Sequence, residues 1–362
     1  MTATDRRPSL DVLRGLTVAG MILVNNAGGP VSWAPLRHSE WNGLTPCDLV
    51  FPFFLFIAGV SLFLSLRRTG FARNARTFGK IARRTLLLLV IGWALTGIHT
   101  YCVSGSLPAL HSWRLTGVLP RIALCYGSVA LAAVVLPHRW MPAAIAGLLA
   151  LYAGLLLAGN GYAPDETNLL VRTDRLLLGA GHLYARHCVD PEGLLSTLPA
   201  VAHTAIGFCC GALYAAAEGP RRDRRLLQLF TTGVGLLAAG WLLAGVLPLN
   251  KRIWSPSFVL VTCGAAALLL AALAVRTDRT GVRSAAGRFF RCCGVNPLLL
   301  YVVAELLAAF AAGSGAKQLI YQAFHAWVPD AAAASAGYAL LFTLLVGALG
   351  GWLWRRRIVV KI

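Results

Sequence analysis

The sequence contains ten apolar runs, each long enough to cross a lipid bilayer as a helix. A transmembrane helix needs about 20 mostly apolar residues. The candidate spans lie at 10–28, 46–66, 85–104, 116–136, 141–158, 194–216, 227–247, 256–276, 295–313 and 332–353. Because an isolated segment in lipid can satisfy its backbone hydrogen bonds only as a helix, these runs predict helices. We therefore predict an all-α, polytopic membrane protein with about ten transmembrane helices.

The composition agrees with a chain that is partly solvated by lipid. Hydrophobic residues make up 57% of the chain and charged residues 13%, against about 45–50% and about 25% in soluble proteins. The formal net charge is +19, but the basic residues stand in short blocks between apolar runs. That pattern is typical of cytoplasmic loops that face anionic lipid. The charge therefore favours contact with the lipid bilayer and argues against a nucleic-acid partner.

The blocks of basic residues also predict how the chain is oriented. The densest blocks lie at 67–84, 221–225 and 276–291, and another follows the last span at 355–357. Positively charged loops face the cytoplasm, so we expect both termini to be cytoplasmic. No Pro/Ser-rich linker divides the chain, and we treat residues 1–362 as a single domain.

Polar and ionisable residues inside the spans are functional candidates, because each charged group at mid-span costs about 2.5–3.5 kcal/mol on insertion scales. Asp11 and Arg14 share a helix face and form either a self-satisfying ion pair or a site for a charged ligand. Glu305 in the ninth span needs a partner, and on charge alone we predict Arg121 of the fourth span. The full set is Asp11, Arg14, Asn25, Asn26, Asp48, His99, Arg121, His203, Asn296 and Glu305.

Two amides end the first span. Asn25 and Asn26 are followed by Ala27 and by two glycines, Gly28 and Gly29. This pattern is typical of a helix stop, but it also suits a pocket where the backbone approaches a ligand closely. Both interpretations stay open at this point.

His38 and Asp48 form the clearest candidate for acid–base chemistry. His38 lies just outside the membrane, and Asp48 begins the second span ten residues later. A histidine beside a carboxylate can act as a general base while the carboxylate fixes its tautomer. Asp48 is also a typical first-turn carboxylate, stabilised by the helix dipole, and the two roles are compatible. None of the nine cysteines forms a pair with metal-site spacing, so we predict no metal.

Several sequence blocks, taken in order along the chain, resemble the heparan-α-glucosaminide N-acetyltransferase family and its bacterial relatives. The blocks are SLDVLRG at 9–15, VNN at 24–26, HSEWNGLT at 38–45, DLVFPFFLF at 48–56, WRLTGVLPRIA at 113–123, DPEGLLSTLP at 190–199, NKRIWSPSFV at 250–259 and GVNPLLLY at 294–301. Together they extend over nearly the whole chain.

The resemblance implies a transmembrane acyltransferase. Such an enzyme moves an acetyl group from cytosolic acetyl-CoA, its acyl-donor co-substrate, to an amino sugar or other glycan acceptor on the extracytoplasmic side. The resemblance assigns His38 as the catalytic histidine and Asn25 as the active-site asparagine, which we expect to stabilise an oxyanion. We expect Asp48 to orient His38. Direct transfer and a covalent acyl-histidine route both remain open.

For the coenzyme A donor, we expect contacts with Arg14, Arg121 and Asn296, whose side chains can bind phosphate or amide groups. The resemblance to bacterial relatives places the protein in the bacterial inner (plasma) membrane. The oligomeric state is left open, with a homodimer as one alternative.

Two other functions fit the same polar residues. A secondary transporter also needs polar groups inside its helices, although no repeated halves with paired broken spans are visible. A non-catalytic relative that binds a glycan or a lipid is the second alternative. Cleavage of the acetyl-CoA thioester distinguishes the enzyme from the transporter and from the non-catalytic relative.

Overall fold

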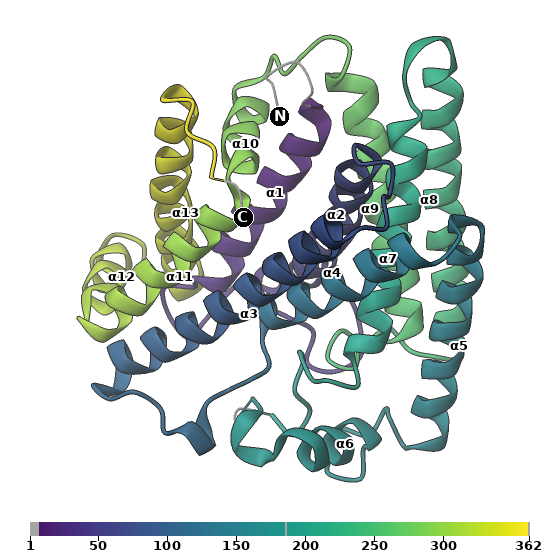
Figure 1. The fold of residues 1–362 in the computed structure, drawn as a ribbon. Helices are drawn as coiled ribbons and strands as arrows, with labels where there is room; N and C mark the ends of the chain where they lie inside the picture. The colour runs from purple at the N-terminus through teal and green to yellow at the C-terminus, as the bar shows by residue number, and fades with distance from the viewer. Residues whose placement is uncertain (1–6, 185–186, 361–362) are drawn as a thin grey trace.

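The computed structural model describes residues 7–184 and 187–360, and these residues form helices and connecting loops without any strand (Figure 1). Short 3₁₀ turns join several of the helices, among them η3 (Pro46–Leu49), which leads directly into α2. The helices are α1 (Pro8–Asn25), α2 (Val50–Arg67), α3 (Ala75–Ser104), α4 (Val118–Val135), α5 (Met141–Ala158), α6 (Leu169–Leu178), α7 (Thr197–Ala215), α8 (Arg222–Ala244), α9 (Pro256–Thr277), α10 (Ala285–Val295), α11 (Pro297–Gly313), α12 (Ala316–Trp327) and α13 (Ala331–Arg355).

The predicted all-α, multi-span architecture is confirmed. Eight helices of the described chain are long and apolar enough to cross a membrane, and a ninth span results if the bent pair α10 and α11 is counted as one. The two helices of that pair meet at 86°, a bend that the predicted span 295–313 did not anticipate. The first predicted span is α1, which is helical but is not among the eight because polar residues interrupt its apolar sequence.

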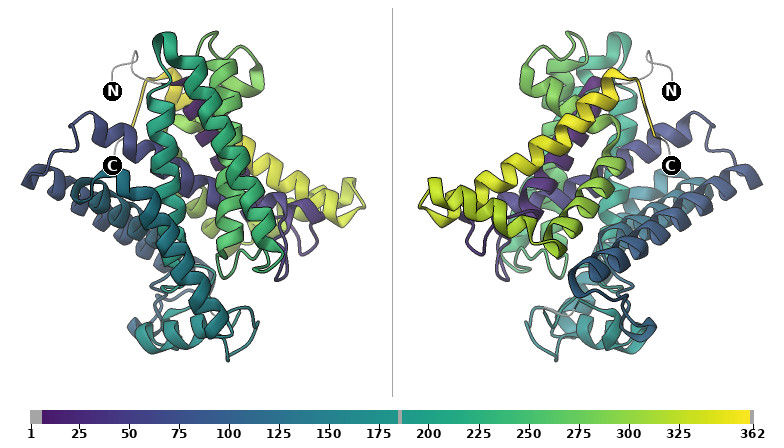
Figure 2. Two further views of the ribbon diagram at one scale, coloured as in Figure 1. Left: turned by 90° about the vertical axis from the view of Figure 1, so that its right-hand side faces the viewer. Right: turned by 90° about the vertical axis from the view of Figure 1, so that its left-hand side faces the viewer.

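The helices divide into an inner set and an outer set. The helices α2, α4, α7 and α9 are mostly buried, whereas α3, α5 and α8 bury only a small share of their residues. Figure 1 shows α5 and α8 along its right-hand edge, and the left view of Figure 2 looks onto that side of the molecule. An exposed apolar side chain costs little in lipid, so helices at the margin can stay apolar on every face.

The inner helices approach closely where glycines replace side chains. A Cβ atom on Gly15 of α1 would lie 1.6 Å from the carbonyl oxygen of Phe290, and one on Gly294 would lie 1.7 Å from that of Asp11. Glycines allow the same close backbone contact between α2 and α7, at Gly59 and Gly207. Since lipid supplies no hydrophobic driving force between helices, such close backbone contact is a main source of packing energy in a membrane protein.

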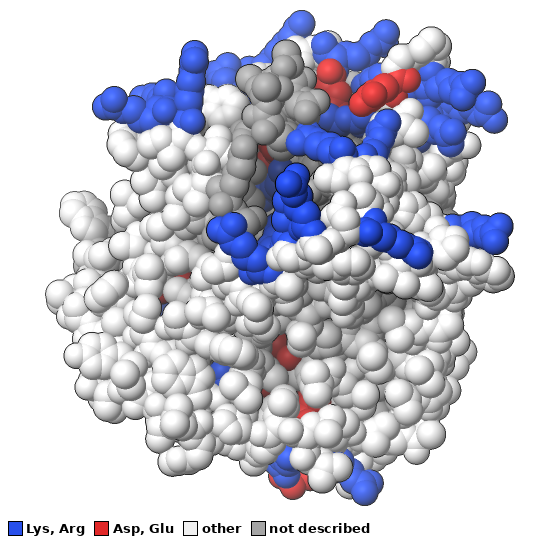
Figure 3. Space-filling model, viewed as in Figure 1, with Lys and Arg blue, Asp and Glu red and all other residues white. Residues whose placement is uncertain are grey.

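Charge is distributed very unevenly over the surface. Lys and Arg side chains gather at the end of the molecule where α1 begins, and most of the face below them is uncharged (Figure 3). The short helix α6 and its flanking loops lie at the opposite end (Figure 1). This arrangement is the one that the predicted orientation requires, with one basic end and a broad apolar belt.

The glycine contact between α1 and α10 makes a direct stability prediction. Gly15→Ala should lower the unfolding temperature, because the new methyl group meets backbone atoms that cannot rotate away. Overpacking of this kind typically costs about 1–3 kcal/mol. Thermal unfolding in detergent measures the change. Gly351→Ala in α13 is the matched control, since a Cβ there meets nothing within 4 Å, and equal unfolding temperatures for the two variants would contradict the prediction.

Candidate active site

The segment between α1 and α2 carries the histidine and the carboxylate that the sequence singled out. Nδ1 of His38 lies 2.7 Å from Oδ1 of Asp48, and the His38 side chain is half exposed while that of Asp48 is fully buried. We assign the proton of Nδ1 to this hydrogen bond, because an ionised carboxylate can only accept. Nε2 then carries the lone pair that a base or a nucleophile needs.

Asp48 is held by the local structure of its own segment. Its Oδ2 accepts hydrogen bonds from the backbone N–H of Ser39 and of Thr45, both at 3.1 Å, and from Oγ1 of Thr45 at 3.0 Å. Thr45 and Asp48 form a capping box at the start of η3, the arrangement in which two residues at this spacing satisfy each other's backbone N–H groups. The capping role and the contact with His38 therefore coexist.

A third charged group enters from the loop between α8 and α9. Nζ of Lys251 lies 2.9 Å from Nδ1 and 3.4 Å from Nε2 of His38, and 3.4 Å from Oδ1 of Asp48. This loop is fastened to the His38 segment. The backbone N–H of Gly43 donates to the carbonyl of Leu249 at 2.7 Å. The buried Asn250 amide donates to Oδ1 of Asn42 at 3.1 Å.

The thiol of Cys47 completes the immediate surroundings of the histidine. Its sulfur lies 3.1 Å from Nδ1 and 3.7 Å from Nε2 of His38, and the side chain is buried. The ring of His38 therefore contacts a carboxylate, an ammonium group and a thiol on its protein side. No group of three or more His, Cys, Asp or Glu side chains in the described chain is arranged to hold a metal ion.

The amides at the end of α1 divide between two roles. The Asn26 side chain donates to the carbonyl of Ile22 at 2.8 Å and so ends the helix, whereas the exposed Asn25 hydrogen-bonds the carboxylate of Glu305 on α11. The two glycines that follow pack against aromatic side chains. A Cβ on Gly28 or Gly29 would collide with tyrosine side chains of α13 and α12, so these glycines serve close packing.

The predicted pair of Arg121 and Glu305 is wrong. Arg121 is buried, and its Nη2 donates to the carbonyl of Gly193 at 2.9 Å and to Oγ of Ser196. Its guanidinium also lies 5.2 Å from the centre of the Trp254 ring. Complementary charge alone selected this pair, but the two helices direct the side chains to different neighbours.

Asn296 occupies the bend between α10 and α11. Its side chain donates to the carbonyl of Ile358 at 2.9 Å and accepts from the N–H of Val360 at 2.9 Å. Both amide functions are thus used to hold the segment after α13. Contacts of Asn296 and of Arg121 with coenzyme A, the acyl donor, remain predictions from the sequence.

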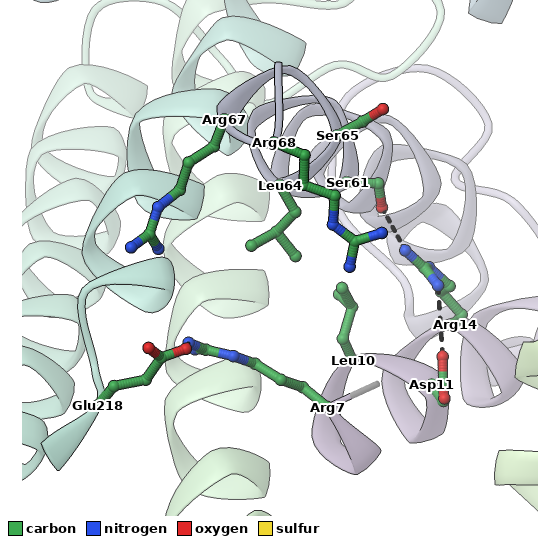
Figure 4. A pocket seen from close by; sticks show the side chains of 10 residues that line it. All are labelled: Arg7, Leu10, Asp11, Arg14, Ser61, Leu64, Ser65, Arg67, Arg68 and Glu218. Atoms are coloured by element: carbon green, nitrogen blue, oxygen red, sulfur yellow. Dashed lines mark hydrogen bonds and ion pairs between the residues drawn. The ribbon is translucent and has the colours of Figure 1, made fainter. Parts of the chain in front are cut away.

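Arg14 is the third residue predicted to contact coenzyme A. It lines a basic pocket of about 380 Å³ at the charged end of the molecule (Figure 4). Arg14 pairs with Asp11 at 3.3 Å, one of the two alternatives left open by the sequence, and donates to Oγ of Ser61 at 2.6 Å. The guanidinium groups of Arg7, Arg14, Arg67 and Arg68 lie around this pocket. The lining residues are Arg7, Leu10, Asp11, Arg14, Ser61, Leu64, Ser65, Arg67, Arg68 and Glu218.

Two of the basic side chains in this pocket are anchored on the end of α7. Arg67 donates to the carbonyl of Ala215 at 2.9 Å, and Arg7 donates to the same carbonyl at 3.0 Å and to Glu218. Carbonyls at a helix C-terminus carry partial negative charge and attract cations. The pocket therefore has fixed positive walls and apolar side chains between them.

Sequence reasoning missed Lys251 and the serines of the basic pocket. Lys251 lies in one of the blocks that carry the family resemblance, directly before a span and on the predicted outer side, where basic residues are less frequent. That position was a usable signal. Ser61 and Ser65 carried none, because single hydroxyl groups in an apolar helix are common.

These observations define a class: a polytopic α-helical membrane protein with a basic pocket at one end of its first two helices and a histidine–carboxylate pair at the other. Residues 6–222 match the family described as heparan-alpha-glucosaminide N-acetyltransferase, catalytic. The chain belongs to this family.

Two curated relatives extend the similarity beyond the matched residues. Heparan-alpha-glucosaminide N-acetyltransferase from Homo sapiens is 30% identical over 363 aligned residues, which cover 83% of this chain and 53% of the relative. The protein of the same name from Mus musculus is 28% identical over 368 aligned residues, covering 84% of this chain and 54% of that relative. The chain spans about half the length of both.

The capping box at Asp48 gives a prediction that does not depend on function. Thr45→Ala should destabilise the protein by about 1 kcal/mol, because Oγ1 of Thr45 also donates to the carbonyl of Arg37 at 2.8 Å. Thermal unfolding measures the loss. Thr45→Ser keeps the hydroxyl and should unfold close to the wild-type temperature; a Ser variant as unstable as the Ala variant would show that the methyl group, not the capping bond, matters.

Proposed function

We propose that this protein is a transmembrane acyltransferase that uses acetyl-CoA. It transfers the acetyl group to an amino sugar or other glycan on the extracytoplasmic side of a bacterial inner membrane, with both termini in the cytoplasm. The observation that carries the proposal is the placement of two polar sites at opposite ends of the same two helices. Family membership supports the same reaction class.

Both α1 and α2 connect the two sites. The first helix begins beside the basic pocket and ends at Asn25, while the second begins at the Asp48 turn and ends at the pocket. At 1.5 Å per residue, Asp48 and Ser61 are separated by roughly 20 Å along the helix axis. Coenzyme A has the matching chemistry, because its phosphates and its thioester stand at opposite ends of a long flexible arm.

The basic pocket suits the phosphate end of the donor. Guanidinium groups pair with phosphate oxygens through two parallel hydrogen bonds, and the pocket offers Arg14 and Arg68 beside the hydroxyl groups of Ser61 and Ser65. This end of the molecule is also its basic end (Figure 3). The donor therefore enters from the cytoplasmic side in our proposal.

His38 supplies the chemistry at the other end. In direct transfer, Nε2 removes the proton of the acceptor amine or hydroxyl as that group attacks the acetyl carbonyl, and the proton then passes to the departing sulfur of coenzyme A. In the covalent route, Nε2 itself attacks the acetyl carbonyl and the carbon–sulfur bond breaks, so coenzyme A leaves as its thiolate. The acceptor then takes the acetyl group from Nε2, and its proton passes to that thiolate. Asp48 holds the ring in the required tautomer in both. Acetyl trapped on His38 in the absence of acceptor would select the covalent route.

Release of coenzyme A tests the proposal directly. Purified wild-type protein should release free coenzyme A from acetyl-CoA faster when glucosamine-type acceptors are present. His38→Ala should reduce that rate by at least 100-fold, since general acid–base catalysis typically contributes 10²–10⁴-fold. If no amino sugar stimulates the release of coenzyme A, amino sugars are not the acceptor class. Solute transport without thioester cleavage would instead establish the transporter, and glycan binding with neither would establish the non-catalytic relative.

A charge introduced into the basic pocket tests the donor site separately. Ser65→Asp should raise the KM for acetyl-CoA and the Kd for coenzyme A about tenfold, which corresponds to about 1.4 kcal/mol of repulsion with the phosphates. The rate at saturating donor should stay near the wild-type value. Ser65→Asn is the matched neutral control and should stay within about twofold of wild type on the same scale. Unchanged donor affinity in Ser65→Asp would place the phosphates elsewhere.

A further inference from the structure

We propose that Lys251 is a catalytic residue of this site and that its ammonium group stabilises the oxyanion formed when the acetyl carbonyl is attacked. The inference rests on the proposed function. Its basis is the position of Nζ, which lies within 3.4 Å of both ring nitrogens of His38 and of the Asp48 carboxylate.

The position of the ammonium group meets the geometric requirement for such a donor. An oxyanion-hole donor must lie 2.7–3.1 Å from the place that the developing oxyanion occupies. Nζ lies 3.4 Å from Nε2 of His38, the nitrogen that attacks the acetyl carbonyl or takes the proton of the attacking group. The carbonyl carbon reacts beside Nε2 in either route, so its oxygen falls within hydrogen-bond reach of Nζ.

The structure holds Lys251 in this place from several sides. Its side chain is only 13% exposed, and its backbone carbonyl accepts from the N–H of Trp254 at 3.1 Å in a tight turn. Trp254 itself is fully buried and has a positive φ of 55°. A positive φ is strained for a bulky residue and persists only where the surrounding structure fixes it. The turn that carries Lys251 is therefore rigid. A donor fixed in advance needs no reorganisation during the reaction.

Asn25 is the competing candidate for this role, because the family resemblance assigns it to the active site. In the structure its side chain hydrogen-bonds Glu305 on α11, whereas the contacts that surround the His38 ring come from Asp48, Cys47 and Lys251. Asp48 carries negative charge and Cys47 is a weak donor. Of the three groups around the ring, Lys251 alone can neutralise a negative oxygen.

The step balances in charge and in atoms. The attacking amine or hydroxyl forms a bond to the acetyl carbon, the electron pair of the carbonyl moves to oxygen, and His38 holds the acceptor's proton. The oxyanion accepts a hydrogen bond from Nζ–H. When the tetrahedral intermediate collapses, the carbonyl re-forms, the carbon–sulfur bond breaks, and His38 delivers the proton to the sulfur of coenzyme A.

The test compares Lys251→Met with Lys251→Arg in the coenzyme A release assay. We expect Lys251→Met to lower kcat by about 10²–10³-fold, the usual effect of losing one oxyanion donor, with the KM for acetyl-CoA and the Kd for coenzyme A unchanged. Lys251→Arg keeps a cationic donor and should retain a kcat within about tenfold of wild type. A kcat within threefold of wild type in Lys251→Met overturns the inference.

A second variant separates catalysis from a purely structural role as the counter-ion of Asp48. Lys251→Met leaves a buried carboxylate without its cation and can unfold the protein, so the double variant Asp48→Asn with Lys251→Met removes both charges. We expect the double variant to regain thermal stability, while its kcat falls about 10²–10³-fold below that of Asp48→Asn alone, which lacks only the orienting carboxylate. A kcat equal to that of Asp48→Asn alone would overturn the catalytic role.

The same assay distinguishes the failure of this inference from failure of the proposed function. Wild-type protein that releases no coenzyme A with any acceptor overturns both. If the wild-type protein is active and Lys251→Met is equally active, only the role of Lys251 is overturned. Asn25 would then be the residue that stabilises the oxyanion, and Asn25→Ala should lower kcat.

Discussion

The buried carboxylate of Asp48 is the interaction on which the rest of the candidate site depends. A fully buried charge is tolerated only when hydrogen bonds and an opposite charge compensate the loss of water. Asp48 obtains both from two segments: His38, Ser39 and Thr45 in its own loop, and Lys251 from a distant loop. Compensation of one buried charge therefore brings His38 and Lys251 together.

The architecture around this carboxylate follows from the requirements of lipid. Helices at the margin can be apolar throughout, whereas α1 is packed against α2, α9, α10 and α13 and tolerates the charges of Asp11 and Arg14 because protein, not lipid, surrounds them. The glycine contact at Gly15 and Gly294 brings α1 close to α10. Interior placement of α1 allows one helix to border the basic pocket at its start and reach Asn25 at its end.

The two sites also differ in how they are built. The basic pocket is assembled from consecutive turns of α1 and α2, with Arg7 and Arg67 tied to the end of α7, so helix periodicity determines most of its lining. The His38 site is assembled from loops. Loops usually carry function on a rigid scaffold, and here the scaffold contributes η3 and the turn before α9, each anchored by buried hydrogen bonds.

Sequence patterns by themselves determined the membrane class, the helical spans, the family and the pairing of His38 with Asp48. These properties depend on local signals: apolar runs, charge blocks, and a histidine ten residues before a carboxylate that begins a helix. Only the tertiary structure decided that Lys251 joins a histidine 213 positions away, that Arg121 does not meet Glu305, and that α10 and α11 bend. Contacts between distant segments depend on how helices pack, and neither charge nor periodicity encodes that geometry.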